Sequence, residues 1–130
     1  MTERLFVYGT LMRSSSHPFA DELSRRADLE GEARYNGRLY SVSTYPGAVG
    51  SADPGEYVFG EVYLLRDPAV LRLLDNYEGC GPDAEVPAEY RRLLQTVTMD
   101  SGPQVEAWVY VYNWPVDKLQ RIASGRFAEP

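Results

Sequence analysis

The sequence has little of the chemistry that binds metals or forms disulfides. Its 130 residues include one cysteine, Cys80, and one histidine, His17. A single cysteine rules out a disulfide framework within the chain, and the lack of a His/Cys cluster or of a calcium-loop spacing of carboxylates argues against a metal site. Neither a phosphate-binding loop nor a dinucleotide fingerprint is present. We therefore expect no metal and no cofactor.

Positive charge is also scarce. The chain has 13 Lys and Arg against 19 Asp and Glu, a formal net charge of −6, and its pI is about 4.8. Nucleic acids and anionic membranes both bind basic surfaces, so we expect neither as a partner. No apolar run reaches the length of a membrane span, and residues 1–4 lead into a strand without the apolar stretch of a secretion signal. These features predict a cytoplasmic protein.

The length and composition are typical of a single folded domain over residues 1–130. Apolar strand patterns cover residues 5–8 and 57–65, and residues 89–99 and 105–112 form a predicted antiparallel hairpin. We expect an α+β domain with a mostly antiparallel sheet and a few short helices. The expected state is a monomer or a weak homodimer.

Short helices and one long loop are predicted between the strands. The pattern of residues 17–27 predicts a helix whose first residue, the only histidine, is a cap or surface residue, and residues 116–122 predict a second short helix. Residues 43–55 are rich in turn formers and are expected to form a surface loop. Within residues 29–42, Asn36-Gly37 is typical of a hairpin turn but equally of a bend in one long strand, which leaves both open.

A further helix pattern ends in an acidic residue. Asp67 and Pro68 suit the start of this helix and Gly79 its end, and apolar residues recur every three or four positions between them. Glu78 therefore falls on the last turn, on or beside the buried face. A helix C-terminus and an apolar environment both disfavour a carboxylate, so we expect the pKa of Glu78 to be raised. Such a carboxyl group suits general acid–base catalysis, although most helix-terminal glutamates are simply solvated.

A tight turn follows the first strand. Gly9-Thr10 ends the apolar run, and Leu11-Met12 continues the turn. Glycine lets the backbone approach a ligand closely, and the N–H groups of such a turn form a small anion-binding concavity. The turn alone does not distinguish this role from that of an ordinary strand end.

Taken together, the two stretches resemble the gamma-glutamylcyclotransferase-like family, which includes gamma-glutamylamine cyclotransferase and the plant avirulence-induced-gene proteins. The resemblance rests on Tyr8-Gly9-Thr10-Leu11-Met12 after the first strand and on Leu74-Asp75-Asn76-Tyr77-Glu78-Gly79 after a later strand and helix. Shorter matches follow in the same order along nearly the whole chain, at residues 37–40, 45–47, 89–92, 107–110 and 122–125.

The resemblance implies a small mixed, mostly antiparallel β-barrel around a cavity. It also implies that the glycine-containing turn holds a glutamyl group and that Glu78 is the acid/base residue. Tyrosine hydroxyls could reach the cavity too, although a buried tyrosine needs only one hydrogen-bond partner to be a core residue. The predicted substrate-binding residues are Tyr8, Gly9, Thr10, Leu11, Met12, Tyr40 and Tyr90.

The implied substrate is a small gamma-glutamyl amide. Family members release 5-oxoproline from such amides, which requires the substrate's own α-amine to attack its γ-carbonyl and expel an amine. Because the reaction is intramolecular, positioning of the substrate supplies much of the acceleration, and no metal is needed. The alternative is a non-catalytic small-molecule binding or interaction protein that kept the fold and the pocket. The identity of the leaving amine stays open.

Overall fold

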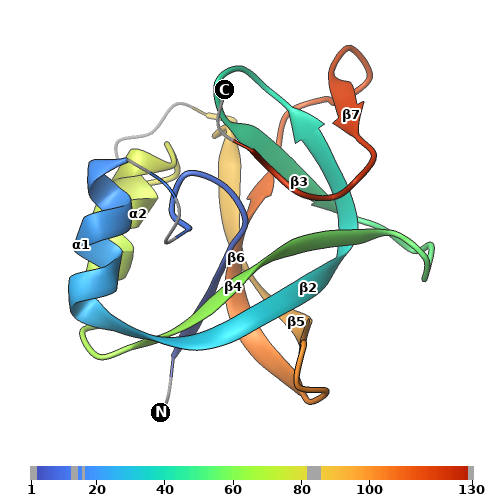
Figure 1. Ribbon diagram of the computed structural model, residues 1–130. Coiled ribbons are helices and arrows are strands. Elements are labelled where there is room, and N and C mark those ends of the chain that lie inside the picture. Colours follow the sequence, from blue (N-terminus) through green and yellow to red (C-terminus); the bar gives the residue numbers. More distant parts are fainter. Residues whose placement is uncertain (1–2, 13–14, 16, 82–85, 129–130) are drawn as a thin grey trace.

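The structure is a strongly curved β-sheet with two short helices packed together on one side (Figure 1). This computed structural model describes residues 3–12, 15, 17–81 and 86–128. Its elements, in chain order, are β1 (Arg4–Val7), α1 (Pro18–Arg26), β2 (Ala27–Ser41), β3 (Pro46–Gly50), β4 (Tyr57–Leu65), α2 (Val70–Tyr77), β5 (Tyr90–Met99), β6 (Gln104–Tyr112) and β7 (Gln120–Ile122).

Five strands close into a mixed barrel. Their hydrogen-bonded order is β1-β4-β2-β3-β6, and the pairing of β6 with β1 closes the ring. The β1–β6 and β3–β6 pairs are parallel, whereas the other neighbours in the ring are antiparallel. Two strands lie outside the ring: β5 pairs with β6 and β2, and β7 pairs with β2. The predicted α+β fold with a mixed, mostly antiparallel barrel is confirmed.

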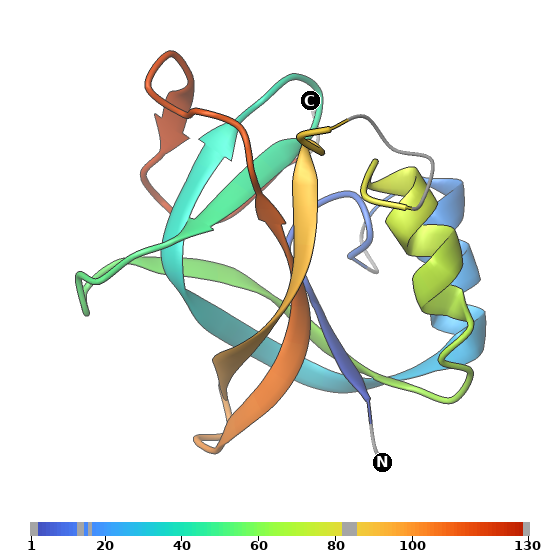
Figure 2. The same cartoon turned by 180° about the vertical axis from the view of Figure 1, so that it is seen from behind.

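Strand β1 separates two apolar cores. Its residues alternate between the two faces, as in any strand, so that Leu5 and Val7 face one cluster and Phe6 faces the other. The first cluster includes Leu23 of α1 and Leu74 of α2, which are both fully buried, and it attaches the two helices to the barrel. The second cluster contains no helix residue among its buried members. Figure 2 shows from behind how both helices stay on one side of the barrel.

Strand β2 settles the alternative at Asn36-Gly37. Residues Ala27–Ser41 form one long strand, in which Asn36 pairs with Tyr57 of β4 and Gly37 pairs with Gly50 of β3. The dipeptide therefore marks no hairpin. The irregularity in this strand lies between Leu29 and Gly31, where the register with β4 shifts. This shift is a β-bulge, which lets a long strand curve around the barrel.

The prediction of a surface loop over residues 43–55 is wrong in its middle. Strand β3 occupies Pro46–Gly50, and its first three residues are buried. Pairing with β2 and β6 on its two sides outweighs the turn propensities of proline and glycine. The proline stands at the first position of the strand, where a missing N–H is tolerated.

The prediction of a helix over residues 116–122 is also wrong. A turn in which the Leu119 N–H donates to the Val116 carbonyl leads into the short strand β7. This strand pairs with the end of β2, so a tertiary contact decides its conformation. A segment this short has no strong helical preference of its own.

The two remaining helices end as predicted, but α2 begins at Val70 with Ala69 as its N-cap, two residues after the Asp67-Pro68 start that the sequence predicted. The His17 side chain caps α1 by accepting a hydrogen bond from the Phe19 N–H. In the turn before α2, the Asp67 carboxylate accepts from the Ala69 N–H at 3.1 Å. Gly79, with φ +74°, reverses the chain after α2. Neither α1 nor α2, the helices in the described part of the chain, has the length and apolar character needed to cross a membrane.

Candidate active site

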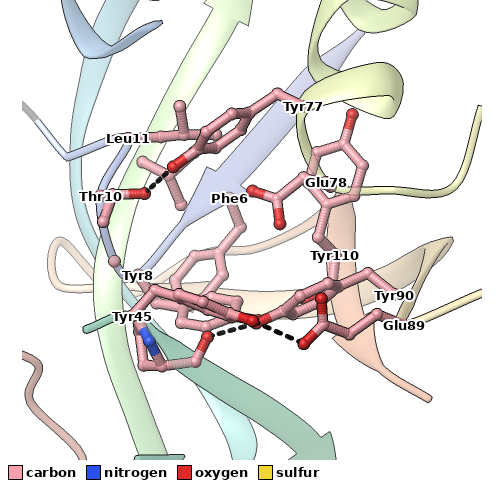
Figure 3. Close-up of a pocket in the computed structure, with 13 residues that line it drawn as sticks. Phe6, Tyr8, Thr10, Leu11, Tyr45, Tyr77, Glu78, Glu89, Tyr90 and Tyr110 are labelled. Atoms are coloured by element: carbon pink, nitrogen blue, oxygen red, sulfur yellow. Dashed lines mark hydrogen bonds between the residues drawn. The ribbon is translucent and has the colours of Figure 1, made fainter. Parts of the chain in front are cut away.

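A cavity of about 210 Å³ lies between the end of α2, the turn after β1, the start of β3 and the start of β5 (Figure 3). Its wall is mostly aromatic and apolar, with two carboxyl groups. The residues that line it are Phe6, Val7, Tyr8, Gly9, Thr10, Leu11, Tyr45, Pro46, Tyr77, Glu78, Glu89, Tyr90 and Tyr110.

Glu78 enters this cavity from the end of α2. Its backbone N–H completes the last helical turn by donating to the Leu74 carbonyl at 2.8 Å, and the chain then turns away at Gly79. The side chain is left pointing into the cavity, as Figure 3 shows. Burial raises the pKa of Glu78 to about 8, and the nearby charge of Glu89 adds to the rise. The predicted direction is confirmed, and burial is its main cause.

The turn after β1 forms the facing wall. The Met12 N–H donates to the Gly9 carbonyl at 3.1 Å, which closes the turn. A Cβ atom at Gly9 would lie 2.8 Å from Cγ of Pro46, so only glycine fits between the turn and β3. The Thr10 hydroxyl lies 2.6 Å from the Tyr77 hydroxyl. This contact joins the turn to the residue before Glu78, so the two stretches, far apart in sequence, meet at the cavity.

Tyr8 and Tyr90 line the cavity, but their hydroxyl groups are already used. The Tyr8 hydroxyl donates to the Tyr110 carbonyl at 2.5 Å and accepts from the Ala48 N–H at 3.2 Å. The Tyr90 hydroxyl donates to the Pro46 carbonyl at 2.6 Å. Burial raises the pKa of both phenols, which keeps them protonated. These two tyrosines therefore contribute their rings to the wall, and neither has a proton free for a ligand.

Two predicted substrate-binding residues do not line the cavity. Met12 packs, partly buried, against the apolar cluster beside the helices. Tyr40 is buried in β2, where it follows Leu39, a member of the second apolar core. Since successive strand residues point to opposite faces, Tyr40 is directed away from that core. The structure gives no support to a ligand contact for either residue.

Seven of the lining residues were not predicted as site residues from the sequence, among them Tyr45, Tyr77 and Glu89. The Tyr45 hydroxyl donates to Oε2 of Glu89 at 2.7 Å, which ties the chain before β3 to the residue before β5. Tyr77 reaches Thr10, as described above. Tyr45 and Glu89 both fall in short stretches that support the family resemblance, at residues 45–47 and 89–92. Their place in these stretches was the only sequence feature that could have pointed to the two residues. No local pattern shows that residues 44 positions apart will meet.

Behind Glu78, a charged group anchors α2 to the sheet. Arg92 of β5 donates to both carboxylate oxygens of Asp75, at 2.8 and 3.2 Å, and the Tyr110 hydroxyl donates to the same carboxylate at 2.7 Å. The Arg92 guanidinium also lies 4.4 Å from the ring centre of Trp108. Because Asp75 lies one helical turn before Glu78, these contacts fix the position of the helix end.

Cys80 is not suited to act as a nucleophile. Its thiol is half-buried, and burial together with the charges of Asp75 and Glu78 raises its pKa to about 11. A reactive cysteine needs the opposite shift. In the described part of the chain, no group of three or more His, Cys, Asp or Glu side chains is arranged to hold a metal ion.

The electrostatic character of the cavity is acidic. Glu78 and Glu89 both line it, and none of the described lining residues is a lysine, an arginine or a histidine. A ligand carboxylate would therefore have to bind neutral donors. The hydrogen bonds of the described residues include none from the backbone N–H groups of Gly9, Thr10 and Leu11, which can serve as such donors.

Comparisons with known proteins find relatives that match nearly the whole chain. A family model described as gamma-glutamyl cyclotransferase, AIG2-like, matches residues 5–129. The gamma-glutamylcyclotransferase family protein YtfP of Escherichia coli (strain K12) is 40% identical over 125 residues, which cover 94% of this chain and 93% of that protein. The solution NMR structure of ytfP from Escherichia coli has a TM-score of 0.63 at 38% identity, covering 95% of each chain. The crystal structure of an aig2-like protein from mouse shares the fold, with a TM-score of 0.65 at 23% identity, covering 99% of this chain and 96% of that chain.

Proposed function

Because the chain belongs to the gamma-glutamyl cyclotransferase, AIG2-like family, we propose that it releases 5-oxoproline and an amine from a gamma-glutamyl amide. The observation that carries the proposal is the position of Glu78. Burial raises the pKa of its carboxyl group to about 8, and the group faces the Gly9 turn across one small cavity. An acid or base near neutral pH beside a concave anion-binding turn is what this cyclisation requires.

The glutamyl group supplies one ammonium and one carboxylate. The α-ammonium pairs with Glu78, because a carboxylate binds a cation and can also accept the proton that the ammonium must lose. The α-carboxylate binds the backbone N–H groups of the turn over residues 9–11, since the described lining offers it no cationic side chain. This orientation folds the substrate so that its amine approaches its own γ-carbonyl.

Glu78 moves protons in both halves of the reaction. As a carboxylate it takes a proton from the α-ammonium, and the freed amine attacks the γ-carbon to form the C–N bond of the five-membered ring. The attacking nitrogen then loses a second proton, and protonation of the leaving nitrogen allows its bond to carbon to break. The protons lost by one nitrogen equal those gained by the other when the amine leaves as an ammonium, so the step balances without a co-reactant.

Positioning supplies much of the rate. Well-oriented intramolecular reactions reach effective molarities of about 10⁵–10⁸ M. General acid–base catalysis adds about 10²–10⁴-fold. The tight wall around the cavity, where hydroxyls of Tyr8 and Tyr90 are fixed to backbone carbonyls, favours a single folded conformation of the substrate.

The test measures, by chromatography, the release of 5-oxoproline from a panel of gamma-glutamyl amides. We expect wild type to release 5-oxoproline and free amine in equal amounts. Glu78→Gln should lower the rate by at least about 10²-fold while binding persists. Glu106→Gln, which changes an exposed carboxyl on β6, is the matched control and should keep full activity.

If wild type releases no 5-oxoproline from any amide of the panel, the enzymatic proposal fails. Binding of the same amides without turnover would then favour the second candidate, a non-catalytic binding protein that kept the cavity. Full activity of Glu78→Gln would instead show that another group carries the protons.

A further inference from the structure

The proposed cyclisation removes two protons from one nitrogen, whereas the Glu78 carboxylate holds only one proton at a time. The α-ammonium gives up its first proton before the attack, and the same nitrogen gives up a second proton once it has joined the ring. Glu78 has to pass the first proton to the leaving nitrogen before it can accept the second. A further group in the cavity that accepts a proton would remove this conflict.

The hydroxyl groups of the cavity wall are poor candidates for this further group. Those among the described lining residues belong to Tyr8, Thr10, Tyr45, Tyr77, Tyr90 and Tyr110. Each of them has a hydrogen-bond partner in the protein. Burial raises the pKa of all five phenols, which disfavours the phenolate that would act as a base. Within the described lining, Glu78 and Glu89 are therefore the groups suited to take up a proton.

Glu89, the residue before β5, is oriented by contacts on both its side chain and its backbone. Its Oε2 accepts the hydroxyl hydrogen of Tyr45 at 2.7 Å, and its backbone carbonyl accepts the N–H of Asn113 at 2.7 Å. No hydrogen bond or ion pair from a described residue reaches Oε1. Because each oxygen of a carboxylate accepts hydrogen bonds on its own, Oε1 is left to accept a proton from a substrate.

The two carboxyl groups reach the same space from different elements. Figure 3 shows Glu78 at the end of α2 and Glu89 at the start of β5, with both side chains directed into the cavity. A glutamyl group bound in a cavity of about 210 Å³ lies beside both of them. The charge of Glu89 contributes to the raised pKa of Glu78, as expected for two carboxyl groups in one site.

We propose that Glu89 is a second catalytic base, which takes the second proton from the ring nitrogen while Glu78 protonates the leaving nitrogen. The inference rests on the proposed function and adds a residue to its chemistry. After the attack, the ring nitrogen carries two hydrogens and a positive charge, and Oε1 of Glu89 takes one of these hydrogens as a proton.

The protons and electrons of this step balance. Glu78 gives the leaving nitrogen the proton that it took from the α-ammonium. The bond between this nitrogen and the γ-carbon then breaks, its electron pair stays on the nitrogen, and the oxyanion re-forms the carbonyl. Glu89 finally gives its proton to the freed amine, which leaves as an ammonium. Both carboxyl groups are thus returned to their starting state.

The experiment measures kcat and KM for gamma-glutamyl-pentylamide with wild type and Glu89→Gln. It is run at about pH 9, above the pKa of about 8 that Glu78 has in wild type, so that a change in Glu78 ionisation contributes little. Glu89→Gln should lower kcat by about 10²-fold, within the range of general base catalysis, and change KM by less than about twofold. Glu106→Gln on β6 is again the control and should keep both constants.

A carboxylate supplied from solution separates proton transfer from a structural effect. Glu89→Ala leaves a gap that formate can enter, whereas Glu89→Gln fills the same space with an amide. Formate should raise kcat of Glu89→Ala by at least about tenfold and leave kcat of Glu89→Gln unchanged. Tyr45→Phe keeps the carboxylate and removes one hydrogen bond to it, so kcat should fall by less than about tenfold.

Four results would overturn the proposal while leaving the proposed function intact. Full kcat in Glu89→Gln shows that this carboxylate takes no proton, and a raised KM with unchanged kcat assigns it to binding. Failure of formate to restore kcat of Glu89→Ala assigns Glu89 to structure. A loss in Tyr45→Phe as large as that in Glu89→Gln assigns the effect to the hydrogen bond. If wild type itself releases no 5-oxoproline, the proposed function fails, and the second base fails with it.

Discussion

The hydroxyl groups of Thr10 and Tyr77 lie 2.6 Å apart and join the turn after β1 to the end of α2. These residues are 67 positions apart in the chain. Tyr77 directly precedes Glu78, and its ring also packs on His17 and Phe19 of the α1 region, with ring centres 4.7 and 4.8 Å apart. The contact therefore links the turn after β1 to the helix end that carries Glu78.

Removing this hydroxyl pair should harm activity more than stability. Tyr77→Phe keeps the ring and its packing and loses one part-buried hydrogen bond, which should cost about 1 kcal/mol in the free energy of unfolding. We expect kcat/KM for 5-oxoproline release to fall by about tenfold, because small displacements of reacting groups are costly. Thr10→Val combined with Tyr77→Phe should be little worse than either change alone. Additive effects in urea unfolding and kinetics would contradict a shared contact.

Glu78 should make stability depend on pH. Its pKa is raised from 4.5 to about 8 in the folded protein, so the folded state binds more protons than the unfolded state between these values. The free energy of unfolding should therefore fall as pH rises from about 4.5 to about 8. Glu78→Gln should be more stable than wild type by at least about 1 kcal/mol at pH 8.5 and nearly equal at pH 4. Denaturant unfolding at both pH values checks this, and an equal difference at both would refute it.

The rate of the reaction should follow the same ionisation. Because Glu78 acts first as a carboxylate, kcat/KM should rise with pH up to about 8. The charge of Glu89 contributes to the raised pKa, so Glu89→Gln should move this rise to lower pH. A pH–rate profile with gamma-glutamyl-pentylamide, which carries no second cation, isolates the effect. An unchanged profile would mean that the two carboxyl groups do not interact in the working enzyme.

Asp75 should matter for stability because its partner is also largely buried. Their side chains are 17% and 24% exposed, and Asp75→Asn leaves the Arg92 guanidinium without its carboxylate. The free energy of unfolding should drop by about 1–3 kcal/mol. Asp28→Asn is the control, since its ion pair with Arg66 is 62% and 53% exposed and should contribute less than about 1 kcal/mol. Equal losses in the two variants would argue against an anchoring role for Asp75.

Local sequence patterns were sufficient to predict the structure where the conformation of an element depends mainly on its own residues. The apolar spacing and end signals of α2 predicted both the helix and the raised pKa of Glu78, because burial on a helix face follows from periodicity. Glycine at position 9 was predicted to let the backbone approach a ligand; the close neighbour in the structure is Pro46 of the same chain, and the ligand contact stays a prediction.

Local sequence patterns gave wrong or missing predictions where contacts with residues distant in the chain determine the conformation. Residues 46–50 carry the composition of a loop, yet two neighbouring strands hold them in the sheet. The meeting of Tyr45 and Glu89 depends on how β3 and β5 are placed, which no local spacing encodes. Tyr40 was predicted to reach the cavity on residue type alone, and the face that it takes is set by the register of β2.

The parallel pairing of Leu5 with Trp108 and of Phe6 with Val109 closes the barrel with residues from the two ends of the chain. Contacts of such high sequence separation form late and slow folding. Tyr8, next to this seam, donates its hydroxyl to the carbonyl of Tyr110, so the wall of the cavity is assembled across it. Ligand binding should therefore stabilise the whole cooperative fold rather than a local segment, and amide hydrogen exchange in β1 and β6 should slow together when substrate analogues are added.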